Sequence, residues 1–144
     1  MERESDPTVV RSVAVHREDV VAAVQAREEG RPAVLRVTPP FSGRMRARLH
    51  VEQDGDGSTD ALHLHPADLL AEDAPAFPTA AGTADRLRTT DRPDTPENRR
   101  ELHLQRVAEW RGAVAGHVVD SVTVPTPDGG HELAVSVLGD GPRE

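Results

Sequence analysis

The residues best suited to chemistry in this 144-residue chain are four basic side chains at alternate positions of one segment. These are Arg44, Arg46, Arg48 and His50, separated by Met45, Ala47, Leu49 and Val51. A period of two predicts a half-buried strand, with basic side chains on one face and apolar side chains on the other. Like charges on one face repel, so an anion or carboxylates from elsewhere would stabilise this arrangement.

Guanidinium groups bind phosphate and carboxylate oxygens through paired hydrogen bonds, so a nucleotide, a nucleic-acid backbone or an acidic protein could lie on this face. The amides of Ser42, Gly43 and Arg44 could form an anion-binding nest just before the strand, although these residues also suit an ordinary turn. The alternative for the basic face is a solvated surface neutralised by some of the 25 acidic residues. The candidate anion site is therefore Ser42, Gly43, Arg44, Arg46, Arg48 and His50.

His63 and His65 show the one spacing in the chain that suits a metal. Two imidazoles at positions i and i+2 share a face of a strand, but a metal site needs further ligands, for which His50 and Asp68 are candidates. The alternative is a pair of surface histidines without a metal, which we expect. The segment 54–58 resembles the start of a calcium loop, but Thr59 stands where glycine is required, so we expect a solvated hairpin loop.

Motifs for catalysis are weak. The chain has no cysteine, no serine in a G-x-S-x-G elbow, no P-loop and no G-x-G-x-x-G segment. A catalytic triad cannot be inferred from residue counts alone. We therefore assign no catalytic residue and no cofactor, and expect a protein that is not an enzyme.

The overall charge limits the partners. All 17 basic residues are arginine, and with 25 acidic residues the net charge is −8, unlike that of proteins that coat nucleic acid. Only three aromatic residues are present, and none lies among the arginines, so nucleic acid is a disfavoured partner. No apolar stretch approaches the length of a membrane span and no secretory signal is visible. We expect a cytoplasmic protein that binds no membrane.

Apolar periodicity predicts two helices. Val20, Val21 and Val24 fall on one face of a helix from Arg17 to Glu28. A second helix starts after Thr95, and its apolar stripe contains Trp110, which we expect in the core.

Strands are predicted around these helices. They span residues 33–37, 44–51, 61–65, 119–124 and 132–138, and the second and third most simply form an antiparallel pair. Residues 125–130 turn between the last two strands, with Asp128 and Gly129 as the turn residues. The fold class is therefore α+β, with two helices packed on a mainly antiparallel sheet of about five strands.

The stretch 71–95 is rich in Ala, Pro, Thr, Asp and Arg and shows no sustained period. We predict a long mobile loop between the third strand and the second helix, with a binding loop as the alternative. The chain then forms a single domain over residues 9–139, with flexible ends at 1–8 and 140–144.

Three segments resemble a group of short uncharacterised haloarchaeal proteins. They are RVTPPFSGRMRARL at 36–49, HLHPADLL at 63–70 and VVDSVTV at 118–124. The resemblance covers about half of the chain and implies a cytoplasm at high salt, which the acidic, lysine-free composition also suits. It implies no activity and no site residues.

These observations lead to three functional hypotheses. The first is a small non-enzymatic binding or regulatory module that meets an anionic partner through the arginine-lined strand. The second is a protein–protein or assembly module that uses a sheet edge or the Val and Trp face of the second helix. The third is a His-dependent metal-binding protein.

Overall fold

The computed structural model describes residues 6–52, 61–126 and 129–139. The expected loop at 54–58, the expected C-terminal tail at 140–144 and the turn residue Asp128 lie outside these residues. Part of the expected flexible N-terminus, residues 6–8, is described. There Pro7–Val9 form a 3-10 turn, which the Asp6 side chain caps.

The structure contains three α-helices and seven strands among the described residues. The helices are α1 (Arg17–Glu28), α2 (Ala80–Arg88) and α3 (Pro96–Val114), and the 3-10 turns are η2 (Pro7–Val9), η4 (Pro66–Leu69) and η5 (Ala115–His117). The strands are β1 (Ser12–His16), β2 (Ala33–Val37), β3 (Arg44–Arg46), β4 (Arg48–Val51), β5 (Leu62–Leu64), β6 (Ser121–Thr126) and β7 (Gly129–Leu138).

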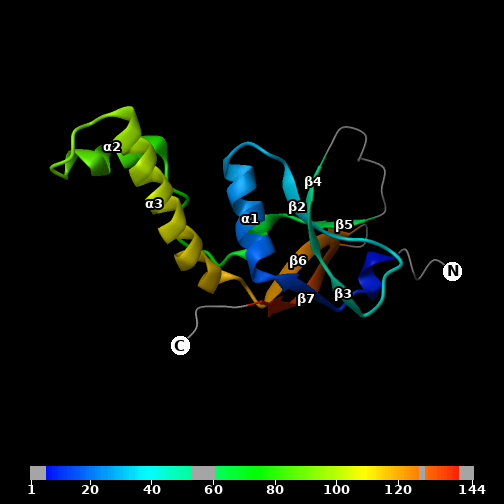
Figure 1. Ribbon diagram of the computed structural model, residues 1–144. Helices are drawn as coiled ribbons and strands as arrows, with labels where there is room; N and C mark the ends of the chain where they lie inside the picture. Colours follow the sequence, from blue (N-terminus) through cyan, green and yellow to red (C-terminus); the bar gives the residue numbers. More distant parts are fainter. Residues whose placement is uncertain (1–5, 53–60, 127–128, 140–144) are drawn as a thin grey trace.

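The strands form two sheets instead of the single predicted sheet (Figure 1). One sheet has the order β3-β1-β7-β6, in which β1 runs parallel to both neighbours. The other has the order β4-β2-β5 and is antiparallel. The predicted pairing between residues 44–51 and 61–65 is therefore wrong, because β2 lies between β4 and β5.

The predicted strand 44–51 is divided between the two sheets at Ala47. The Ala47 amide donates to the Ala14 carbonyl at 2.9 Å, while β3 pairs with β1 and β4 pairs with β2. The alternation of side chains continues through this junction, so the sequence pattern does not reveal the change of partner. Leu49 and Val51, which we expected to point inward, are each 38% exposed.

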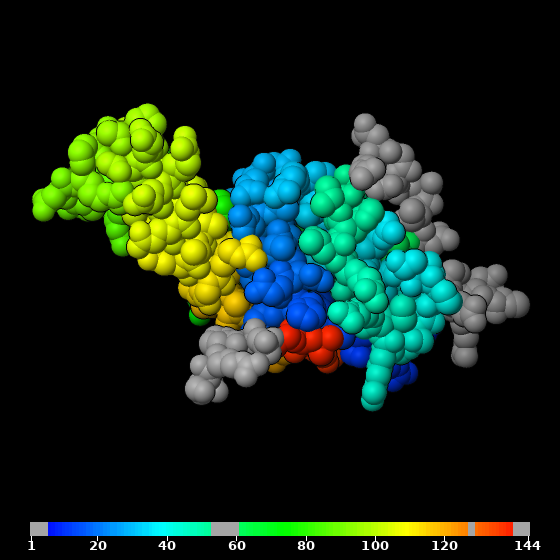
Figure 2. Space-filling model, viewed as in Figure 1, coloured from blue at the N-terminus to red at the C-terminus, as the bar shows by residue number. Residues whose placement is uncertain are grey.

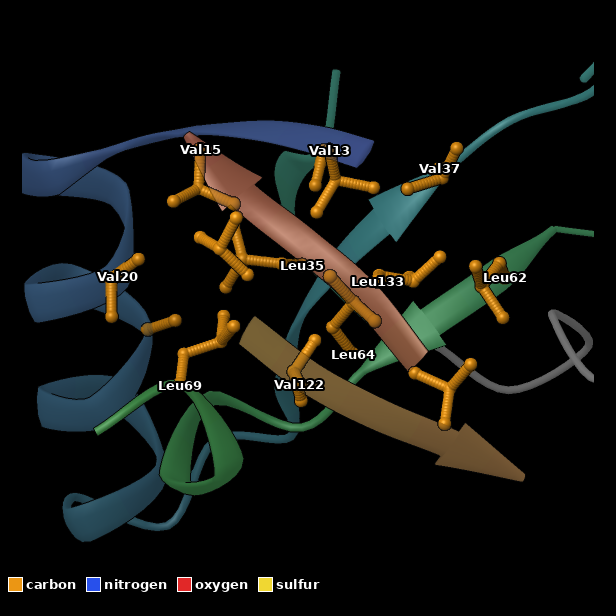
Figure 3. Packing of buried hydrophobic residues seen from close by; sticks show 14 of the residues in the cluster. Val13, Val15, Val20, Leu35, Val37, Leu62, Leu64, Leu69, Val122 and Leu133 are labelled. Carbon is orange, nitrogen blue, oxygen red and sulfur yellow. The ribbon is translucent and has the colours of Figure 1, made fainter. Parts of the chain in front are cut away.

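The main core lies between the two sheets and α1 (Figure 3). Leu35 of β2, Leu64 of β5 and Leu133 of β7 are almost completely buried there, together with Val20 of α1. Aliphatic side chains supply nearly all of this core, as the shortage of aromatic residues requires. Burial of their apolar surface stabilises the fold by about 25 cal/mol per Å².

The expected loop at 71–95 contains α2, so its interpretation as a structureless connection is wrong. Thr79 caps this helix by accepting a hydrogen bond from the Gly82 amide at 3.0 Å. Ala84 and Leu87 form its buried side. The prolines before and after α2 led to the prediction of a loop, although the segment between them has its own cap and a narrow apolar face.

Helices α2 and α3 form a hairpin that extends away from the sheets (Figure 1). In the described part of the chain, α3 packs on the rest of the domain through its C-terminal end, where Trp110 and Val114 cluster with Val21 of α1. Phe77 meets Trp110 edge to face, with 4.9 Å between ring centroids. The expectation that Trp110 belongs to the core is confirmed, since it is 4% exposed.

Among the described residues, no helix has the length and apolar character needed to cross a membrane.

Candidate anion-binding surface

The four basic residues singled out in the sequence lie on two adjoining sheet edges. Arg44 and Arg46 belong to β3, the edge of the four-stranded sheet, and Arg48 and His50 belong to β4, the edge of the three-stranded sheet. Ala47 is completely buried, so the two arginines beside it point away from the core. The β3–β4 segment lies on the molecular surface (Figure 2).

Arg44, Arg46 and Arg48 differ from most other arginines of the described residues in having no side-chain hydrogen bond or ion pair. Of the 15 arginines in the described part of the chain, nine have a side-chain hydrogen bond and six have none. The six are Arg11, Arg44, Arg46, Arg48, Arg86 and Arg100.

Four of the six belong to neighbouring segments of the backbone. The Arg11 amide donates to the Gly43 carbonyl at 2.9 Å, and the next residue, Ser12, pairs with Arg44 in the sheet. We call Arg11, Arg44, Arg46 and Arg48 the arginine edge. The alternative of a surface neutralised by the chain's own carboxylates receives no support from the described residues.

A row of basic groups continues from the arginine edge across the three-stranded sheet. Arg48 on β4 is opposite Arg36 on β2, and Arg36 is in turn opposite His63 on β5. Arg36 Nη1 lies 3.2 Å from Nε2 of His50, which holds this guanidinium over the sheet. His63 Nδ1 lies 3.4 Å from a carboxylate oxygen of Glu52. Among the described residues, this face therefore presents two guanidinium groups and two imidazoles, with the Glu52 carboxylate beside His63.

The loop before β3 binds its own neighbours. The Ser42 amide donates to Met45 Sδ at 3.3 Å, and the Ser42 hydroxyl donates to the Arg44 carbonyl at 2.9 Å. The Gly43 carbonyl accepts hydrogen bonds from the amides of Arg11 and Ser12. These contacts fix the start of β3 against β1, and the anion-binding role of the Ser42 and Gly43 amides stays a prediction.

The two histidines with metal-like spacing have different surroundings. His63 faces Glu52, whereas His65 Nδ1 accepts a hydrogen bond from the Ala67 amide at 3.1 Å and caps η4. No group of three or more His, Cys, Asp or Glu side chains suited to a metal ion occurs in the described residues. A metal at His63 and His65 stays a prediction.

Elsewhere, carboxylates do hold arginines. Asp94 receives two hydrogen bonds from Arg99, at 2.5 and 2.8 Å, and these bonds lower the pKa of the Asp94 carboxyl below its usual range. The same contact raises the pKa of Arg99. In Glu29, the hydrogen bond from Gln25 is the main cause of a lowered pKa, and Arg31 adds to it. Carboxylate pairing thus occurs in this chain, but no carboxylate of residues 6–52, 61–126 and 129–139 pairs with the arginine edge.

Two members of this surface were not identified from the sequence. Arg36 is the one polar residue of β2, and a charged residue within an apolar strand was the only sign of a function there. No helix or strand was predicted at Arg11, which is brought beside β3 by the parallel pairing of β1 with β3.

The chain belongs to a family described as a domain of unknown function (DUF8009), whose match covers residues 1–139. No curated protein and no solved structure matched the chain.

Proposed function

We propose that this domain is a binding module that takes up an anionic partner along the arginine edge. The observation that carries the proposal is a concentration of exposed arginines, in an acidic chain, that have no carboxylate partner among the described residues. Arg44, Arg46 and Arg48 lie on edge strands of the two sheets and Arg11 directly precedes β1, while most described arginines elsewhere are hydrogen-bonded. A fixed set of unneutralised guanidinium groups favours carboxylate or phosphate oxygens as ligands.

Three observations favour an acidic protein segment over a nucleic acid. Phe41 and Trp110 are each 4% exposed, and Phe77 packs on Trp110, so no aromatic ring on this surface offers a stacking platform. The net charge of −8 repels a long nucleic acid, with one charge per phosphate, more strongly than a short acidic segment of a protein. In addition, Leu49 and Val51 expose apolar surface beside Arg48, which suits a protein partner.

We further propose that the chain is haloarchaeal and works in a salt-rich cytoplasm. The excess of acidic residues, the absence of lysine and the resemblance of three segments support this origin. At high salt, charge attraction is screened within a few ångströms, about 3 Å at 1 M. Binding would then depend on direct hydrogen bonds from the guanidinium groups and on the apolar contacts of Leu49 and Val51.

The test compares two triple variants with the same change in charge. In one, Arg44, Arg46 and Arg48 are replaced by Gln; in the control, Arg31, Arg86 and Arg88 are replaced by Gln. Affinity for a labelled polyglutamate peptide and a labelled oligothymidylate is measured by fluorescence anisotropy. We expect the first variant to bind the peptide about tenfold more weakly than the wild type, and the control to bind it equally well.

The outcomes separate the possible explanations. Equal weakening in both variants would mean that only net charge matters, and the proposed site would be wrong. Tighter, Arg44-dependent binding of the oligonucleotide would replace the protein partner with a nucleic acid. No binding of either probe by the wild type would overturn the proposed function.

A further inference from the structure

A second surface lies on the hairpin of α2 and α3, at the other end of the molecule from the arginine edge (Figure 1). The hairpin is joined to α1 near the C-terminal end of α3. There Arg111 Nη2 donates to Glu18 at 3.0 Å and Nη1 donates to Gln25, while Arg17 donates to the Ala115 carbonyl at 2.6 Å. In the space-filling view, α2 and the start of α3 protrude from the rest of the chain (Figure 2).

A buried hydroxyl fixes the two helices of this hairpin to each other. Thr83 of α2 is 2% exposed and is the one buried polar residue in the described part of the chain. Its Oγ1 lies 2.8 Å from Nδ1 of His103 and accepts a hydrogen bond of 2.8 Å from Arg106. These bonds hold the His103 ring in place between the helices, so the surface around it is preorganised.

Beside Thr83 and His103, residues of the two helices line a cavity of about 270 Å³ that is open to solvent. Its lining consists of Ala80, Thr83, Arg99, Arg100, His103 and Leu104, with no acidic residue. Leu104 is 64% exposed, the largest exposed fraction of any large hydrophobic residue in the described part of the chain. The cavity lining therefore combines apolar side chains with two arginines and a histidine.

The two arginines of the cavity lining differ in their side-chain partners. Arg99 is already bound by Asp94, whereas Arg100 has no side-chain partner among the described residues. Arg100, Leu104 and Ala108 are exposed at intervals of four residues, so they form a row along α3 with neighbours about 6 Å apart. This row offers one cationic position, one large apolar side chain and one small side chain over two helical turns.

We propose that this cavity binds an acidic amphipathic helix of a partner protein. An apolar side chain of that helix enters the cavity against Leu104, and a carboxylate one turn away on the same helix binds Arg100. The row on α3 has the spacing of helix positions i and i+4, which a second helix packed along it matches. The unpaired guanidinium of Arg100 favours an acidic helix, and Ala108 allows the two helices to approach closely.

The test uses a labelled helical peptide with leucines at positions i, i+3, i+4 and i+7 and glutamates elsewhere. Binding is measured by fluorescence anisotropy for the wild type, L104D and R100Q. We expect L104D to weaken binding by at least about tenfold and R100Q to weaken it several-fold. The matched control is L138D, because Leu138 is also an exposed leucine, at 38%, and lies on β7.

The peptide with its leucines and glutamates scrambled should bind poorly to the wild type. Equal binding of the scrambled peptide, or equal loss in L104D and L138D, would overturn the proposal. A dimer in sedimentation analysis that L104D dissociates, combined with no peptide binding, would also overturn it, because the occupant would then be a second copy of the chain. Thermal unfolding of L104D should match the wild type, since Leu104 is exposed.

Discussion

Arg36 and Arg48 lie directly opposite each other on β2 and β4. The side chain bonded to Arg36 is His50, and no carboxylate of the described residues contacts Arg48. Like charges at opposed positions of a sheet destabilise the fold. The chain therefore keeps a destabilising pair at the surface for which we propose a binding function.

Replacing Arg48 with Glu should make the protein more stable. The new carboxylate would face Arg36, and opposed unlike charges contribute roughly 0.2–1 kcal/mol to the free energy of unfolding. The same variant should bind polyglutamate more weakly. Urea unfolding followed by circular dichroism measures the first effect. Arg46→Glu is the control because Arg46 pairs with Ala14, and a stability gain equal to that of Arg48→Glu would contradict the prediction.

Replacing Trp110 with Phe should destabilise the junction between the hairpin and α1. Trp110 Nε1 donates to the Pro75 carbonyl at 3.0 Å, and the ring is 4% exposed. Loss of this bond leaves a carbonyl without its donor and a small void, at a cost of about 1–3 kcal/mol. Urea unfolding gives the value. Phe77→Leu, which keeps the hydrogen bond, should cost less, and the reverse order would contradict this account.

Replacing Asp94 with Asn should reduce stability at neutral pH but not in acid. Hydrogen bonds from Arg99 hold the pKa of Asp94 below its ordinary value in the folded chain. The stabilisation is therefore present above the unfolded pKa and is lost as the pH falls below about 4. The thermal midpoints of wild type and variant should differ at neutral pH and converge in acid. A difference that persists in acid, or one that Asp91→Asn reproduces, would rule out this pair as the cause.

High concentrations of KCl should stabilise the chain if it comes from a salt-rich cytoplasm. The net charge of −8 produces self-repulsion that added salt screens. The thermal midpoint should rise steadily between about 0.1 and 2 M KCl, where the screening length falls from about 10 Å to below 3 Å. A midpoint that falls over this range would argue against the proposed origin.

The sequence predicted those elements that carry their own boundary signals. Helix α1 spans Arg17–Glu28, as its valine spacing indicated. Helix α3 starts at Pro96 after Thr95, whose side chain accepts a hydrogen bond from the Asn98 amide. Strand β2 also has its predicted bounds of Ala33–Val37. In each case a local signal determines the element: the valine spacing in α1, the Thr95 cap in α3 and the apolar run in β2.

The arrangement of strands could not be predicted because it depends on contacts between distant segments. The segment around Ala47 has one uninterrupted alternation, yet it pairs with β1 on one side of that residue and with β2 on the other. The arginines of the candidate site were visible in that alternation. Arg11 and Arg36 join them only through the pairings of β1 and β2. For the same reason, the cavity between α2 and α3 had no signal in the sequence.

In the described part of the chain, helix α3 is attached to α1 at its C-terminal end, so its N-terminal end can change position. Its 19 residues span about 28 Å, and the contacts of Trp110 and Arg111 with α1 and its surroundings lie within the last two turns. A rotation of about 10° at that base would displace the far end by about 5 Å. A small change at the base of α3 is thus amplified at its far end. A change in the contacts of Arg111 with Glu18 and Gln25 of α1 would therefore move the α2–α3 hairpin relative to the sheets.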